Sequence, residues 1–245
     1  MSKPFKFKQF TIQQERCAMK VGTDGVLLGA WAPLEHQPGA ILDIGAGTGL
    51  IALMMAQRSG AKTIDAIEID NDAYEQCVEN FEASSWADRL FCYHAGLEEF
   101  AGEMEIQYDL IVSNPPYFSS PRSDATGGGA RPTSNSRIMA RSRESLPFGQ
   151  LLKSVATLLS PQGRFATIIP YPEEEPFLHV AAMNHIFPAS LCRVRGNTDS
   201  PWKRSLMVLS PLKRDVTHGA LTIEIKRHQY TEAYIGLTKE FYLDM

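Results

Sequence analysis

The sequence contains no apolar run long enough to cross a lipid bilayer. Its longest runs, such as Leu50–Ala56, are far shorter than the about 20 residues that a membrane-spanning helix needs. The N-terminus has lysines but no apolar core of a signal peptide. The four cysteines show no Cys-x-x-Cys or Cys-x-x-His spacing, which argues against a metal site or a redox pair. These absences predict a cytoplasmic protein with no membrane partner, no metal and reduced cysteines.

The net charge is small, but the charged residues are unevenly distributed. The net charge is only −4, yet residues 65–109 carry thirteen acidic residues against one basic residue, Arg89. Basic residues gather in the segments 1–20, 121–145 and 193–215. A solvated surface explains any one of these runs, but three of them beside one acidic block favour a local nucleic-acid footprint. The predicted RNA-binding residues are Arg122, Arg131, Arg137, Arg141, Arg143, Lys203 and Arg204.

Short apolar runs alternate with amphipathic segments along most of the chain. Strands are predicted at 40–45, 62–70, 88–96, 108–113 and 164–170, and helices at 48–60, 71–83 and 148–163. This alternation is typical of an α/β fold with a doubly wound, mostly parallel sheet. Two further strands, 204–210 and 219–226 with a turn between them, predict an antiparallel C-terminal hairpin. Residues 119–146 have few large apolar side chains and are expected to form a mobile, Arg-rich loop within one domain spanning 1–245.

A glycine-rich turn, "LDIGAGTGL", follows the first predicted strand. Gly45, Gly47 and Gly49 allow the backbone to approach a ligand closely, and the next helix presents its positive N-terminal end to that ligand. The spacing differs from the fingerprint of dinucleotide-binding proteins. Asp43 precedes the turn, and Glu68 ends the next strand, where a carboxylate can accept ribose hydroxyls. Together these residues predict a site for S-adenosylmethionine.

The fourth predicted strand ends in "YDLIVSNPPYFSS". Proline has no backbone N–H, so strand pairing must stop at Pro115 and Pro116. The side-chain oxygen of Asn114 and the carbonyl of Pro115 can each accept one N–H of an amino group conjugated to a ring, which aims its lone pair at a methyl group. The prolines hold these acceptors fixed, and Tyr117 offers a face for stacking. A plain Asn-Pro turn is the competing interpretation of this motif taken alone.

The combination of "DIGAGTG" and "NPPY" resembles methyltransferases that act on adenine N6, cytosine N4 or glutamine amides. With "RCAMKVGTDGVLLGAW" (Arg16–Trp31), "SSWADRL" and "QYTEAYIGLTKEFYLDM", the chain resembles the bacterial tRNA(Val) adenine-37 N6-methyltransferase family over almost its whole length. The resemblance implies a Rossmann-like class I methyltransferase with a seven-stranded sheet, S-adenosylmethionine as cofactor and tRNA as partner. It also implies that residues 1–39 cover the cofactor, with Lys20, Thr23 and Asp24 near its methionine tail. Thr23 or Asp24 would equally suit the cap of a helix.

One position departs from the usual pattern of such enzymes. An aspartate often follows the third strand and holds the amino group of the cofactor's adenine, but this chain has Gly96 there. Backbone groups around Ala95–Leu97, including those of Leu97 itself, are expected to replace it, or Glu98 reaches in.

Two other functions share part of this evidence. A protein glutamine methyltransferase would use the same "NPPY" motif, although such enzymes usually carry a sizeable helical domain before the catalytic one, and only 39 residues precede Ala40. A non-catalytic RNA-binding protein with a relic fold would not need an intact glycine loop. The sequence does not define the oligomeric state, for which a monomer is the default expectation.

Overall fold

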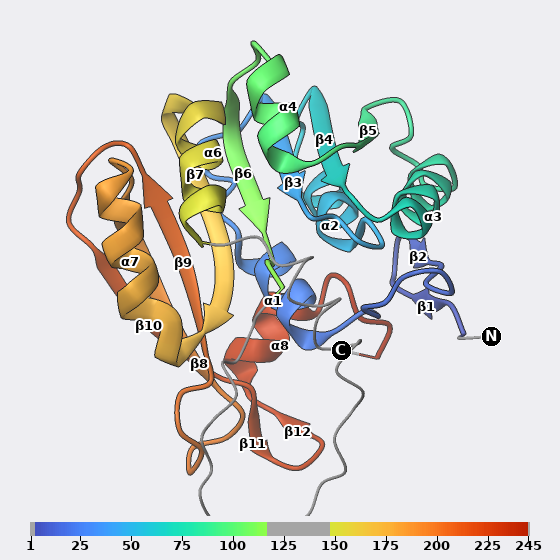
Figure 1. Ribbon diagram of the computed structural model, residues 1–245. Helices are drawn as coiled ribbons and strands as arrows, with labels where there is room; N and C mark the ends of the chain where they lie inside the picture. The colour runs from blue at the N-terminus through green and yellow to red at the C-terminus, as the bar shows by residue number, and fades with distance from the viewer. Residues whose placement is uncertain (1–2, 117–147, 245) are drawn as a thin grey trace, which may run out of the picture.

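The computed structural model describes residues 3–116 and 148–244. The main sheet consists of β3 (Ala40–Ile44), β4 (Thr63–Glu68), β5 (Leu90–His94), β6 (Tyr108–Ser113), β7 (Leu159–Pro170), β8 (Phe187–Arg195), β9 (Arg204–Ser210) and β10 (Thr217–Thr222). Within the described residues these eight strands lie in the order β10-β8-β9-β7-β6-β3-β4-β5 (Figure 1). All neighbours from β7 to β5 are parallel, and β9 runs antiparallel to both β7 and β8. The predicted α/β, doubly wound class is confirmed.

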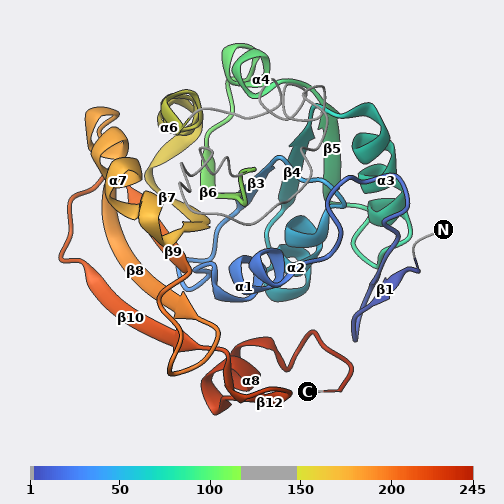
Figure 2. The ribbon, with the colours of Figure 1, turned by 60° about the horizontal axis from the view of Figure 1, so that its bottom comes forward.

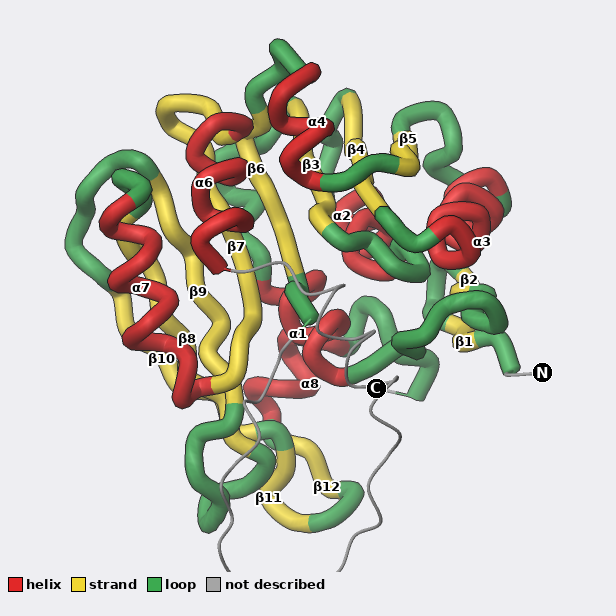
Figure 3. The backbone as a smooth tube through the Cα atoms, viewed as in Figure 1, coloured by secondary structure: helices red, strands yellow, loops and turns green. Residues whose placement is uncertain are grey.

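Helices cover both faces of the sheet (Figures 1 and 3). They are α1 (Thr23–Trp31), α2 (Leu50–Arg58), α3 (Asn71–Glu82), α4 (Leu97–Glu103), α6 (Phe148–Leu158), α7 (Glu174–Met183) and α8 (Glu232–Thr238), with a short 3-10 helix η1 (Tyr171–Glu173). Successive strand residues point to opposite faces. Ile41 therefore packs in the core beneath α1, α2, α3 and α8, whereas Leu42 packs in the core beneath α4, α6 and α7.

The C-terminal half of the sheet differs from the sequence prediction in one respect. The predicted strands around 204–210 and 219–226 exist, but β8 lies between them. The antiparallel hairpin consists of β8 and β9, and β10 adds to β8 in parallel as an eighth strand beside the seven expected. The run Phe187–Arg195 is mostly half-buried and carries proline, serine and two arginines. Its apolar pattern is therefore too weak to predict a strand from local sequence.

Helix α6 also ends earlier than predicted. It stops at Leu158, and β7 begins at once with Leu159, which pairs with Tyr108. The register then shifts, so that Leu110 pairs with Arg164. This irregularity accommodates the proline and glycine that were expected to separate helix from strand.

The two ends of the chain pack against each other. An N-terminal hairpin of β1 (Phe5–Lys6) and β2 (Thr11–Ile12) lies beside the last residues, and a second hairpin, β11 (Glu224–Lys226) with β12 (Gln229–Tyr230), precedes α8. The Lys8 amide donates to the Phe241 carbonyl at 2.8 Å, and the rings of Phe7 and Tyr242 stack with centroids 5.9 Å apart. Residues 241 and 242 therefore complete the packing around the N-terminal hairpin.

Candidate active site

The predicted motifs meet at the carboxyl edge of the parallel strands (Figure 2). Ile44, the last residue of β3, pairs with Ile67 of β4 on one side and with Ser113 of β6 on the other. The Ser113 hydroxyl also donates to the Ile44 carbonyl at 2.9 Å. The glycine loop and Asn114 therefore leave neighbouring strands at the same level. Ligands of open α/β sheets bind at this edge.

The three glycines of the loop have two different roles. All have positive φ, 72° at Gly45, 55° at Gly47 and 76° at Gly49, which side chains disfavour. A Cβ at Gly45 or Gly47 would meet no atom within 4 Å. A Cβ at Gly49 would lie 2.6 Å from Cε1 of Phe81 and 2.9 Å from Sγ of Cys77. The first two glycines thus face open space, where a ligand fits, whereas Gly49 is required by packing.

Glu68 holds this loop through backbone amides. Its Oε2 accepts from the Gly47 N–H at 2.8 Å, and its Oε1 accepts from Ile69 at 2.8 Å and Asp70 at 2.9 Å. A carboxylate offers about four acceptor positions, so one position on Oε2 remains for a ligand hydroxyl. Accepting both ribose hydroxyls requires the Gly47 N–H to turn away. Asp70 itself caps α3, since its Oδ1 accepts from the Ala73 N–H.

Asp43 carries an unsatisfied carboxylate oxygen beneath the loop. The side chain is fully buried, its Oδ2 accepts from the Ala52 N–H at 3.0 Å, and its Oδ1 has no hydrogen-bond partner among the described residues. Burial, together with the nearby charge of Glu68, raises the pKa of Asp43 to about 7, although the hydrogen bond from the Ala52 N–H opposes the shift. A cationic ligand at this edge would favour the carboxylate form.

The N-terminal block lies against the glycine loop. The Asn80 side chain donates to the carbonyls of Thr48 at 2.8 Å and Gln13 at 2.9 Å. The pKa of the Cys17 thiol is raised to about 11, chiefly by burial and then by the charge of Glu68, which places Cys17 near that carboxylate. The Lys20 ammonium donates to backbone carbonyls of this block, those of Gln14, Glu15 and Cys17. In this conformation Lys20 joins backbone carbonyls within the N-terminal block.

Thr23 and Asp24 begin α1 but do not cap it. The N-cap is Gly22, which forms no side-chain capping bond, so the capping interpretation is wrong. The Asp24 carboxylate instead accepts from Nε of Arg204 at 2.8 Å, across 180 positions of sequence. A residue predicted to lie near the cofactor therefore pairs with one predicted to bind RNA. The N-terminal block and β9 are joined by this ion pair.

The acceptor end of the site is described as far as Pro116. Asn114 is half-buried, Pro115 is buried and Pro116 is exposed, directly after β6. Tyr117 and the arginines predicted to bind RNA between 122 and 143 lie outside the described residues. Lys203 is exposed and Arg204 half-buried at the start of β9, which is the same edge of the sheet.

Gly96 caps α4 with an ordinary extended backbone, and Leu97 is buried in the core. The sequence analysis missed a neighbour, Ile69. Its side chain is 67% exposed, and its Cδ1 lies 3.8 Å from where a Cβ of Gly96 would stand. An apolar residue directly after the acidic end of a strand is the signal that would have identified Ile69. Ile69 and Gly96 together offer an apolar surface for a flat ring beside Glu68.

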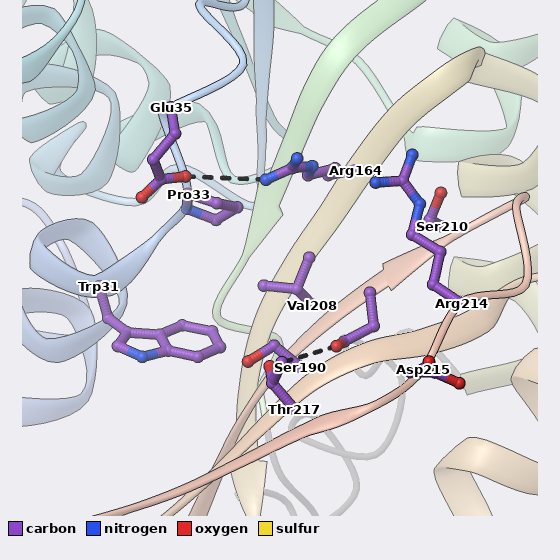
Figure 4. Close-up of a pocket in the computed structure, with 11 residues that line it drawn as sticks. Trp31, Pro33, Glu35, Arg164, Ser190, Val208, Ser210, Arg214, Asp215 and Thr217 are labelled. Atoms are coloured by element: carbon purple, nitrogen blue, oxygen red, sulfur yellow. Dashed lines mark hydrogen bonds and ion pairs between the residues drawn. The ribbon is translucent and has the colours of Figure 1, made fainter.

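A separate cavity of about 380 Å³ lies at the opposite, amino edge of the sheet (Figure 4). Arg164 forms an ion pair with Glu35 there at 3.7 Å, and Thr217 donates to the Ala189 carbonyl at 3.3 Å. Trp31 forms one wall. The cavity contains none of the predicted site residues.

Within residues 3–116 and 148–244, no helix has the length and apolarity to span a membrane. No cluster of three or more histidine, cysteine or carboxylate side chains in this part of the chain is arranged to hold a metal ion.

Solved structures establish the class of the fold. A predicted O-methyltransferase from Agrobacterium tumefaciens superposes with a TM-score of 0.66, covering 89% of this chain and 96% of the other at 15% identity. A ribosomal protein L11 methylase from Lactobacillus delbrueckii subsp. bulgaricus superposes with a TM-score of 0.53, covering 76% of each chain at 16% identity. The protein therefore has the fold of a class I methyltransferase.

Sequence comparisons define the family. Residues 25–164 match the model of the Methyltransferase small domain. A tRNA1(Val) (adenine(37)-N6)-methyltransferase of Flavobacterium psychrophilum is 53% identical over 98% of this chain and 100% of its own length. The enzyme of the same name from Bacteroides fragilis is 42% identical over the full length of both chains. The chain belongs to the tRNA1(Val) (adenine(37)-N6)-methyltransferase family.

Proposed function

We propose that this protein transfers a methyl group from S-adenosylmethionine to N6 of adenine 37 in the anticodon loop of tRNA1(Val), in the cytoplasm. The observation that carries the proposal is the placement of the glycine loop and Asn114 at one level on adjacent strands, β3 and β6. Adjacent strands are about 4.8 Å apart, so cofactor and acceptor base would be held side by side. Full-length relatives with that activity support the choice of substrate.

The residues at this edge fit S-adenosylmethionine. Gly45 and Gly47 leave room for close approach to the backbone, and Glu68 retains an acceptor position for a ribose hydroxyl. The unpartnered Oδ1 of Asp43 suits a ligand that carries positive charge. Ile69 is exposed beside Gly96, as a surface for the adenine ring. Lys20, Thr23 and Asp24 act in this proposal by closing the N-terminal block over the cofactor.

When bound, S-adenosylmethionine supplies an electrophilic methyl group. The Asn114 side-chain oxygen and the Pro115 carbonyl accept the two N–H bonds of the adenine amino group. This weakens delocalisation of the nitrogen lone pair into the ring and directs it toward the methyl carbon. The bound cofactor would supply the methyl group and leave as S-adenosylhomocysteine, and the proton displaced from the amino group would pass to water. The chemistry requires no strong general base from the protein.

A loop base suits this site better than a base within a duplex. Bringing a base into a pocket costs unstacking and unpairing energy, which is smallest for an unpaired nucleotide. Tyr117 would supply a stacking face for that base, and the arginines between 122 and 143 would contact the RNA backbone.

The direct test is transfer of radiolabelled methyl groups to tRNA1(Val), followed by mapping of the modified nucleotide. Asn114→Ala should lower the rate at saturating cofactor by about a hundredfold or more while cofactor affinity stays near that of the parent. Asn184→Ala, at the end of α7, is the matched control and should behave as the parent. Normal turnover of Asn114→Ala would refute the mechanism, and labelling of protein rather than tRNA would favour the glutamine methyltransferase.

A further inference from the structure

Two aromatic rings at the carboxyl edge of the sheet are each covered by an arginine from β8. The guanidinium carbon of Arg193 lies 5.1 Å from the centre of the Tyr171 ring. That of Arg195 lies 4.8 Å from the centre of the Trp202 ring. Arg193 and Arg195 are two residues apart on one strand, so they share a face. The structure therefore contains two arginine–aromatic pairs next to each other.

These pairs continue the row of strand ends that begins at Asn114. Tyr171 follows directly after β7, which is the neighbour of β6, and Trp202 lies in the connection between β8 and β9. The Lys203 carbonyl accepts from the Tyr171 N–H at 3.1 Å, which ties the two pairs together. β8 is three strands from β6, or about 14 Å at ~4.8 Å per strand. About four stacked nucleotides cover that distance at ~3.4 Å each.

Neither aromatic ring packs in the apolar core. Tyr171 and Trp202 are half-buried and belong to neither apolar core. The guanidinium groups are nevertheless fixed by further bonds. Arg193 is paired at 2.8 Å with Glu174, whose carboxylate also accepts from the Ser205 hydroxyl.

Arg195 is fixed in the same way. It donates through Nε to Oγ1 of Thr222 at 3.0 Å and through Nη1 to the Thr198 carbonyl at 2.8 Å. The turn that carries Trp202 has its own support, because Oδ1 of Asn197 accepts from the Ser200 hydroxyl at 2.7 Å. The backbone of this turn therefore does not depend on the indole ring.

We propose that the pairs Tyr171–Arg193 and Arg195–Trp202 form a stacking track for the unpaired nucleotides that flank the methylated adenine. This proposal rests on the proposed function, which supplies an anticodon loop as substrate. Aromatic faces stack on any base, and a guanidinium adds both a flat face and a phosphate contact. The track would hold the neighbours of the target base while that base enters the pocket at Asn114.

The test uses anticodon stem-loop RNA of tRNA1(Val), intact or with a single abasic nucleotide on either side of adenine 37. Trp202→Ala should weaken binding of the intact RNA about 5- to 140-fold, the range for the loss of one base stack. Trp202→Phe keeps a flat ring and should stay close to the parent. Arg195→Lys keeps the charge but loses the planar face, and should weaken binding as well.

The matched control is Lys213→Ala. Lys213 belongs to the basic segment 193–215, but it lies at the opposite edge of the sheet, 4.6 Å from the centre of the Phe187 ring, in an interaction of the same type. Its replacement should therefore leave RNA affinity unchanged. Cofactor affinity, measured on every variant, shows that each is folded.

If the track exists, the effect of Trp202→Ala disappears with one of the two abasic RNAs, because the base that stacks on the ring is already missing. An equal loss with the intact RNA and both abasic RNAs, or no loss with the intact RNA, overturns the proposal. Failure of the parent protein to methylate adenine 37 would instead overturn the proposed function.

Discussion

Alanine at Gly47 and alanine at Gly49 should damage the protein in opposite ways. At Gly47 the added methyl group meets no atom within 4 Å, so the stability cost is that of a positive φ, about 1–2 kcal/mol. The methyl group would, however, occupy the space in which we place the cofactor. At Gly49 the same φ cost applies, and the methyl group would also lie 2.6 Å from the Phe81 ring. Overpacking adds about 1–3 kcal/mol, for a total of roughly 2–5 kcal/mol.

The two variants are compared by urea unfolding and by calorimetric titration with S-adenosylhomocysteine. Gly47→Ala should lose only about 1–2 kcal/mol of stability but bind the ligand at least about tenfold more weakly, a loss of about 1.4 kcal/mol or more. Gly49→Ala should lose a large part of a typical stability of about 5–15 kcal/mol. Phe81→Leu in the same chain should restore some of that stability by making room. Parent-like binding by Gly47→Ala would refute the assignment of the loop's open side to the ligand.

Two carboxylates at the same edge give further predictions. Glu68→Gln, which keeps an acceptor but loses the charge, should weaken ligand binding by roughly 1 kcal/mol, and Glu68→Ala by about 1.5–3 kcal/mol; unchanged affinity in calorimetry would mean that the ribose is held elsewhere. The pKa of Asp43 is about 7 in the folded protein and about 3.9 in an unfolded chain. Between about pH 4 and about pH 7, folding therefore takes up a proton at Asp43. Because of this uptake, the free energy of unfolding falls as the pH rises through that range. Asp43→Asn should remove this part of the pH dependence in urea unfolding, whereas parallel profiles of variant and parent would show that Asp43 stays ionised.

Local sequence was sufficient to predict that the glycine loop, Glu68 and Asn114 lie at one edge of the sheet. The glycine loop, the acidic end of β4 and the Asn-Pro-Pro break after β6 are each encoded within about ten residues, and a parallel sheet brings such strand ends to one edge. The prediction therefore needed no knowledge of distant contacts. Ile69 was missed, although its place directly after the acidic end of β4 could have indicated it. Its closeness to Gly96 depends on the pairing of β5 with β4, which local sequence does not give.

Contacts between residues far apart in the sequence could not be predicted from local sequence patterns. The partner of Asp24 is Arg204, far along the chain, and no local signal connects them. The insertion of β8 between β9 and β10 is likewise decided by tertiary packing, because a half-polar strand such as Phe187–Arg195 gains its stability from its neighbours. The anchoring of Arg193 and Arg195 follows from this insertion and was not predicted for the same reason.

The contact between the two ends of the chain has a consequence for synthesis on the ribosome. The Lys8 ammonium donates to the Lys239 carbonyl at 2.6 Å, and the hairpin of β1 and β2 completes its packing against residues near 241. The chain emerges N-terminus first, at about 5–20 residues per second, so this hairpin waits for more than two hundred residues before its partner exists. The central sheet can assemble earlier from strands close in sequence, β3 to β6. The segment that leads from the hairpin to the glycine loop would therefore become ordered late, and a nascent protein would complete its cofactor site only after residues near 241 have left the ribosome.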